Sequence, residues 1–139
     1  MAAFERFPDL YHAAMARRFC WRLGVEPRGV DADLALIAAA ERTMVESRTG
    51  LDAFFLTHRG GRDAAGALAE ALAGSVPVAS DHPYWSGDAP QAMLIVEVEA
   101  IWAAIAERDD WQPLADKVAA VRAMGEALGE PPRPEGHAG

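Results

Sequence analysis

Apolar residues recur every three or four positions along most of this chain, a spacing typical of helices that bury one face. The first stripe has four members: Tyr11, Met15, Phe19 and Leu23. Pro8 suits an opening turn because its missing N–H has no helical partner there, and Gly24 suits the left-handed residue that ends a helix. We therefore predict a first helix over residues 8–23.

A second helix is predicted to begin beside Asp31, whose carboxylate can cap free N–H groups, and to end at Thr49-Gly50. Asp33 lies in its first turn, where a negative charge complements the helix dipole. Its expected buried face has five members: Leu34, Ile37, Ala38, Met44 and Val45. The loop before it, with Pro27 and Gly29, separates the first two helices.

Two shorter helices are predicted over residues 51–58 and 63–73, on either side of a Gly60-Gly61 stop. Residues 74–90 should be irregular because four residues interrupt any regular element: Pro77, Pro83, Gly87 and Pro90. Two strong helices follow. Their apolar stripes are Leu94, Val98, Ile101, Trp102 and Ile105, then Leu114, Val118, Val121 and Leu128. Asp110 is expected to cap the second of these helices.

These elements predict an all-α fold, an irregular helical array of about five or six helices. A length of 139 residues fits one domain. We assign residues 1–128 to a single helical domain. Residues 129–139, rich in proline and glycine, are predicted to form a flexible tail.

The charge of the chain argues against two classes of partner. The net charge is −8, with 51% hydrophobic and 24% charged residues. Nucleic acids and anionic membrane surfaces both need a basic face, so neither is an expected partner. Residues 1–30 are locally basic, with five arginines and three acidic residues. That basic first helix either meets an acidic partner or is a solvated helix face.

The location predicted for the protein is the cytoplasm. A lone cysteine, Cys20, excludes an internal disulfide and favours a reducing compartment. No apolar run approaches the ~18 residues of a membrane helix. The N-terminus lacks the apolar region of a secretory signal.

Three groups of residues carry candidate chemistry, each with an alternative structural interpretation. Cys20 is either a reactive thiol beside arginines or a small buried residue. His58, His82 and Asp81 either converge on a metal or are surface and cap residues, like His12 and His137. Arg59-Gly60-Gly61-Arg62 either binds an anion through backbone N–H groups and guanidiniums, or is a glycine helix stop between surface arginines.

Acidic and aromatic residues gather in the part of the chain that follows residue 53. The acids Glu97, Glu99, Glu107, Asp109 and Asp110 fit solvent-facing positions and a helix cap better than a metal or acid–base site. The aromatics are Phe54, Phe55, Tyr84, Trp85, Trp102 and Trp111. They are expected to be core residues for the most part, yet large apolar groups of this kind also form docking surfaces.

The order of these features resembles the C-terminal region of the selenoprotein O family, pseudokinase-like protein adenylyltransferases. Arg22-Leu23-Gly24 ends a helix of bulky residues, and an Asp33-Leu34 helix bearing Met44 precedes Asp52 and the pair Phe54-Phe55. Ile101 and Ala104 then lead through Asp109-Asp110-Trp111 to Leu114 and Leu128. The resemblance covers most of residues 4–128.

The resemblance implies the C-terminal helical part of a kinase-like fold. The family binds ATP with a divalent metal such as Mg²⁺ and transfers AMP to protein hydroxyls, and its phosphate and metal groups precede the region matched here. This chain has a single lysine, Lys117, and no Asp-Phe-Gly-like motif. No catalytic, cofactor-binding or metal residue is therefore carried over. The implied partner is the missing catalytic lobe.

Two other functions remain open. The chain is alternatively a stand-alone helical binding module, or homodimer, that uses its aromatic second half as an interface. A third hypothesis is a small metal-dependent enzyme built on His58, His82 and nearby acids.

Overall fold

The computed structural model describes residues 7–133, and within that range the chain is helical without a sheet, which confirms the all-α prediction. The described helices are α2 (Phe7–Leu23), α3 (Val30–Ser47), α4 (Leu51–Thr57), α5 (Gly66–Leu72), α6 (Ile95–Arg108) and α7 (Gln112–Leu128). Two short 3₁₀ turns, η1 (Arg59–Gly61) and η2 (Pro83–Ser86), lie between them. Part of the predicted tail, residues 134–139, lies outside the described residues, as does His137.

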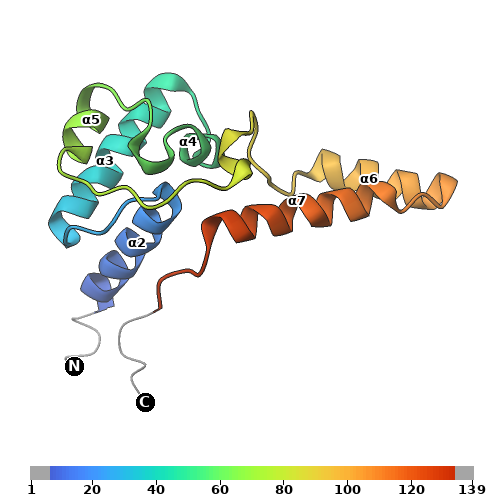
Figure 1. Cartoon of the computed structure of the whole chain (residues 1–139), viewed down its shortest axis with the longest axis horizontal. Coiled ribbons are helices and arrows are strands. Elements are labelled where there is room, and N and C mark those ends of the chain that lie inside the picture. Colours follow the sequence, from blue (N-terminus) through green and yellow to red (C-terminus); the bar gives the residue numbers. More distant parts are fainter. Residues whose placement is uncertain (1–6, 134–139) are drawn as a thin grey trace, which may run out of the picture.

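The helices divide into two groups in space. Helices α2 to α5 gather into one body, whereas α6 and α7 form an antiparallel hairpin that extends away from it (Figure 1). We call this hairpin, residues 95–128, the arm. An irregular segment connects the two groups and makes one isolated bridge, between Val25 and Pro77. The predicted irregular stretch, residues 74–90, is confirmed apart from the short turn η2.

The core lies where α2, α3, α4 and α5 meet. Its buried members are Cys20, Leu23, Val25, Leu36, Ala40, Phe54, Phe55 and Leu68. The rings of Phe54 and Phe55 meet edge to face at 5.9 Å, and Phe19 packs against Phe55 at 5.1 Å. Aromatic side chains bury large apolar areas, so this cluster fixes the short helix α4 against α2.

The predicted buried face of α3 is correct at Met44, which packs against the core, and wrong at Ala38 and Val45. Leu36, Ala39 and Ala40 are the buried apolar residues, while Ala38 and Val45 are exposed. The sequence pattern placed the buried face on the side of α3 that carries Leu34, Ile37 and Val45. The alanines, however, let α2 and α5 approach closely, so the face with small residues became the buried one.

Three local predictions are also corrected. Asp31 does not cap α3, because the helix begins at Val30 with Gly29 at its N-cap. Helix α5 begins at Gly66 rather than at residue 63, because Asp63 adopts a left-handed conformation with φ of 53°. Tyr11 is exposed, since the first half of α2 extends beyond the core.

Candidate functional site

Cys20 is a buried core residue rather than a reactive thiol. Its side chain is fully buried, and the thiol hydrogen-bonds to the carboxylate of Asp33, which also accepts the Arg28 backbone N–H at 3.0 Å. Burial, followed by the negative charge of Asp33, raises the pKa of Cys20 to about 12. The thiolate is the nucleophilic form of cysteine, and a thiol with this pKa stays protonated at neutral pH. Cys20 is therefore unreactive there.

The two arginines of Arg59-Gly60-Gly61-Arg62 bind backbone carbonyls of the protein itself. Arg59 is buried and donates to the carbonyls of Trp21 and Arg22 at 2.9 and 3.1 Å, at the C-terminal end of α2. Arg62 donates to the carbonyls of Leu56 and Trp85 at 2.7 and 3.0 Å. These guanidiniums connect separate elements of the chain through its own carbonyls. The structure therefore favours a structural role for the two arginines over an anion-binding site.

The buried position of Arg59 depends on two neighbours. Its guanidinium lies over the ring of Trp85, 4.2 Å from the centroid. A Cβ atom on Gly24 would lie 2.5 Å from Arg59 Nε, so only glycine leaves room for the side chain. Burial, and then the charge of Arg62, lower the pKa of Arg59. The C-terminal carbonyls of α2 provide the negative end of a helix dipole, which favours a cation there.

The histidines do not converge. His58 Nδ1 lies 2.8 Å from the Arg62 carbonyl, and its ring contacts Phe54. His82 Nδ1 accepts the Tyr84 N–H at 3.2 Å, as a cap of η2, and its Nε2 lies 3.7 Å from Glu126. Among residues 7–133, no group of three or more His, Cys, Asp or Glu side chains is arranged to hold a metal.

A hollow with a volume of about 460 Å³ lies between α3 and α5. Arg42, Glu46, Ser47, His58 and Asp63 are among the residues that line it. Side chains of both charges face it, and none of its lining residues is buried. It therefore lacks the buried convergent polar groups of a ligand site.

The arm presents the most unusual surface of the molecule. In α6 only Ala104 is buried, and α7 has no buried residue. Trp102 is 68% exposed, Ile95 76% and Val98 46%, although this helix has the highest apolar content of the long helices. Soluble monomers rarely leave such a row of large apolar side chains uncovered, so the arm is the candidate docking surface.

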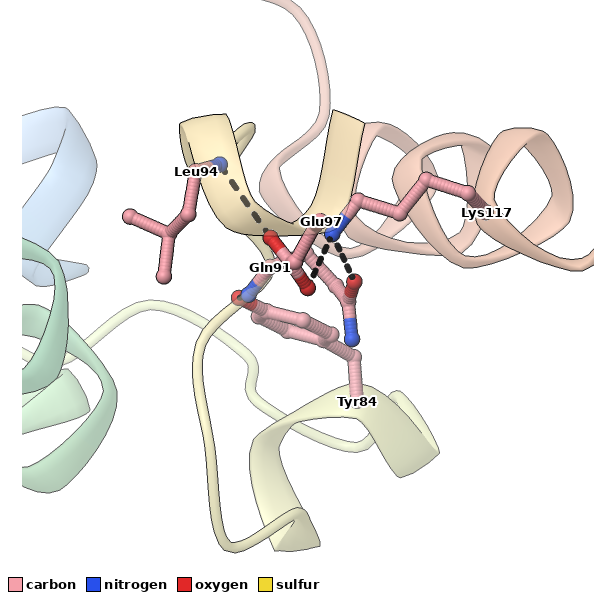
Figure 2. A network of polar contacts seen from close by, with 5 residues as sticks. All are labelled: Tyr84, Gln91, Leu94, Glu97 and Lys117. Carbon is pink, nitrogen blue, oxygen red and sulfur yellow. Dashed lines mark hydrogen bonds and ion pairs between the residues drawn. The ribbon is translucent and has the colours of Figure 1, made fainter. Parts of the chain in front are cut away.

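A polar network holds the base of the arm together (Figure 2). The ammonium of Lys117, on α7, donates to Glu97 Oε1 and to Gln91 Oε1, both at 3.1 Å. Glu97 Oε2 accepts the Leu94 N–H at 3.1 Å, in the first turn of α6. The Tyr84 hydroxyl accepts the Gln91 N–H at 3.2 Å and so extends the network to η2. We call these five residues the latch.

The latch stabilises the charged form of Glu97. The hydrogen bond from the Leu94 N–H, and then the one from Lys117, lower the pKa of Glu97. Lys117 is only 9% exposed, so its ammonium depends on these oxygens in place of water. Glu97 was predicted to be a solvent-facing acid, and the sequence pattern indicated no partner for Lys117. The spacing Leu94–Glu97, in which Glu occupies the third helical position, was the signal available for half of this network.

The body holds the arm at two further places. Trp21 Nε1, on α2, donates to the Leu128 carbonyl at the end of α7 at 3.1 Å. Met124 and Leu128 also line a small hollow beside Tyr84 and Trp85. These contacts involve the C-terminal half of α7, and they leave α6 to project from the body (Figure 1).

The remaining acids and aromatics have separate positions. Asp110 Oδ1 accepts the Gln112 N–H at 3.1 Å, but Asp110 is not the predicted cap, because the N-cap residue of α7 is Trp111. Asp109 Oδ1 accepts the indole N–H of Trp111 at 2.9 Å. Trp85 is buried, whereas Trp102 and Trp111 are exposed. The aromatic residues of the second half are thus divided between core and surface.

No family model, curated protein or solved structure that we compared with the chain matches it. Within residues 7–133, no helix has both the length and the apolar character that crossing a membrane requires.

Proposed function

We propose that this chain is the C-terminal helical segment of a selenoprotein O-type protein adenylyltransferase. In this proposal the segment is inactive alone, and the exposed face of α6 packs on the catalytic lobe. The lobe would contribute the ATP- and Mg²⁺-binding groups, and the chain would act as a supporting scaffold. The order of motifs from Arg22-Leu23-Gly24 to Leu128 suggests the family.

One structural observation carries the proposal. Helix α6 spans 14 residues, of which only Ala104 is buried, while Ile95, Val98 and Trp102 are exposed. A two-helix hairpin of this size gains little stability from its own contacts, because most helical stability comes from burying an apolar face. A covering protein surface would supply that burial. The body, in contrast, has a buried core of its own.

A reconstitution experiment tests this proposal. The purified chain, incubated with ATP, Mg²⁺ and acceptor proteins, is expected to transfer no AMP. The catalytic region of a selenoprotein O-type enzyme, supplied as a separate polypeptide, is expected to bind the chain. Val98→Asp should abolish that binding, whereas Val45→Asp, at an exposed site on α3, should not. AMP transfer by the chain alone, or no binding to the catalytic region, would contradict the proposal.

The alternative is a stand-alone helical module that dimerises through the arm. Exposed Trp102 and Trp111 favour it, because tryptophan is enriched at the centre of protein interfaces. Light scattering over a range of concentrations separates the two proposals. A dimer that Val98→Asp converts to a monomer supports the module, and a monomer at all concentrations supports the segment.

A further inference from the structure

We propose that His82 is a pH-sensitive switch at the base of the arm, which exchanges a backbone partner in η2 for a carboxylate on α7 when its ring gains a proton. The switch follows from what each ring nitrogen contacts in the folded chain. It involves only groups of this chain, so it does not depend on the proposed function or on what covers the arm.

The Nδ1 atom of His82 carries no proton in the folded chain. It lies 3.2 Å from the backbone nitrogen of Tyr84, and a backbone N–H can only donate. Nδ1 therefore accepts this hydrogen bond through its lone pair, and His82 serves as the N-cap of η2. In a neutral imidazole the proton is then on the other nitrogen, Nε2.

The Nε2 atom of His82 lies near the arm. It is 3.7 Å from Oε2 of Glu126, in the last turns of α7. This distance is longer than a hydrogen bond, and 73% of the Glu126 side chain is exposed, so the contact is weak while the ring is neutral. A charged ring attracts the carboxylate more strongly. His82 thus lies between two partners, one in η2 and one on α7.

The two partners favour different protonation states of the ring. A protonated imidazole carries a hydrogen on both nitrogens and cannot accept a hydrogen bond. Protonation of His82 therefore directs an N–H of the ring at the N–H of Tyr84 and removes the cap, while the positive charge strengthens the attraction to Glu126. Histidine is the side chain that ordinarily changes charge between pH 5 and 8, so the exchange is expected in mild acid.

Other charged groups on the elements around η2 have their own partners. These pairs are Arg22 with Asp52, Lys117 with Glu97, and Arg59 and Arg62 with backbone carbonyls. Among residues 7–133, the carboxylate of Glu126 comes within ion-pair distance of the His82 ring, and that of the adjacent Asp81 does not. Glu126 is therefore the group that receives the charged ring.

Loss of the cap reaches the latch through Tyr84. The backbone of this residue donates the capping N–H, and its hydroxyl accepts the Gln91 N–H at the base of the arm (Figure 2). One residue thus connects the ring of His82 to the latch. In mild acid the η2 side of the latch loses this support, while α7 gains a charged partner at Glu126. The contact that holds the arm shifts from η2 toward the end of α7.

Nuclear magnetic resonance of the intact chain at pH 8 and pH 5 tests the switch. The nitrogen shifts of the ring report which atom carries a proton, and we expect a proton on Nε2 alone at pH 8. The protection factor of the Tyr84 amide, which corrects for the intrinsic effect of pH on exchange, should fall about fivefold at pH 5. Cross-peaks from the His82 ring to Tyr84 should weaken, and those to Glu126 should strengthen.

Substitutions at the two half-buried histidines separate the switch from a general effect of acid. His82→Asn keeps a capping oxygen but cannot ionise, so the Tyr84 amide should lose its pH dependence. His58→Asn is the matched control. The Nδ1 atom of His58 lies 2.8 Å from the Arg62 carbonyl, which can only accept, so that bond survives protonation of the ring. This variant should keep the pH dependence of the Tyr84 amide.

Several outcomes would overturn the inference. These are a proton on Nδ1 of His82 at pH 8, unchanged protection of Tyr84 at pH 5, or the same pH dependence in His82→Asn. Glu126→Gln should still lose the cap in acid, and an unchanged approach of the ring to α7 in this variant would exclude Glu126 as the second partner. Circular dichroism checks that each variant is folded. If His82→Asn is unfolded, His82→Ser provides a second capping residue that does not ionise.

Discussion

The guanidinium of Arg59 lies 4.2 Å from the centroid of the Trp85 ring and donates two hydrogen bonds to the end of α2. One buried cation thus joins α2, η1 and η2. Cation–π contacts are strongest when water is excluded, and Trp85 is itself buried. The connection between the body and the segment leading to the arm therefore depends on this side chain.

Replacing Arg59 by methionine is expected to lower the free energy of unfolding by about 2–3 kcal/mol, because two carbonyls lose charged donors in a buried place. Urea unfolding followed by circular dichroism measures the change. Arg42→Met provides the control, since Arg42 is exposed on α3, and its effect should stay within about 0.5 kcal/mol. Equal effects of the two substitutions would show that Arg59 does not stabilise the fold.

Gly24→Ala is expected to destabilise the protein by about 3 kcal/mol or more, because the new Cβ would lie 2.5 Å from Arg59 Nε. Gly74→Ala is a matched control. The two glycines have φ of 79° and 82°, yet the nearest atom to a Cβ on Gly74 is 3.8 Å away. The control should lose only about 1 kcal/mol from backbone strain. Thermal melts of both variants would reveal whether the losses differ.

The Cys20 thiol is expected to resist alkylation at pH 8 in the folded protein and to react quickly in urea. Its folded pKa, about 12, lies above its ordinary value of 9.0. The unfolded chain therefore binds fewer protons than the folded one between these values. Stability falls as the pH rises through that window, by at most about 1.4 kcal/mol per pH unit.

Urea unfolding at pH 8 and pH 10 measures this dependence, and Cys20→Ala is the control because alanine does not ionise. The variant should lose less stability between the two pH values than the natural chain does. The same pH dependence in both proteins would show that Cys20 does not have the raised pKa.

Breaking the latch is expected to loosen the arm while leaving the body intact. Glu97→Gln and Lys117→Met should each lower the hydrogen-exchange protection of the first turns of α6 and α7. Protection in α2 and α3 should stay unchanged. Glu99→Gln, at an exposed position on the same helix, is the control. Equal loosening by Glu99→Gln would exclude a specific role for Glu97.

The latch also predicts a pH dependence with a definite sign. The folded pKa of Glu97 lies below its ordinary value, so its stabilising effect is complete above that ordinary value. The effect disappears as the pH falls through the lower, folded value. Protection of the Leu94 and Glu97 amides should fall in the same acidic range, and Glu97→Gln should remove the dependence.

The sequence predicted most helices well because their ends carry recognisable residues. Gly24 ends α2 as expected, with φ of 79°, and Pro113 lies in the opening turn of α7. The short helix α4 was also located correctly between Gly50 and the Gly60-Gly61 stop. These signals act within a few residues, and a sequence pattern can therefore identify them.

The buried faces were harder to predict because they depend on contacts between distant helices. Periodicity marked Trp102 and Val98 as a helical stripe, but it could not indicate that the stripe lacks a partner within the described chain. Neither interpretation of Arg59, an anion ligand or a surface arginine, is a buried contact, since nothing local shows that the end of α2 would surround it. The Lys117 network joins residues up to 26 positions apart and has the same origin.

Lys117 is the only lysine in the chain, and its ammonium is held between two oxygens. Reagents that acylate amines therefore find one side-chain target, and they can modify it only when the ammonium leaves its partners and gives up a proton. The rate of acylation at this residue would measure how often the base of the hairpin opens. Mass spectrometry can follow this acylation in the natural protein, so the opening of the hairpin can be measured without an engineered label.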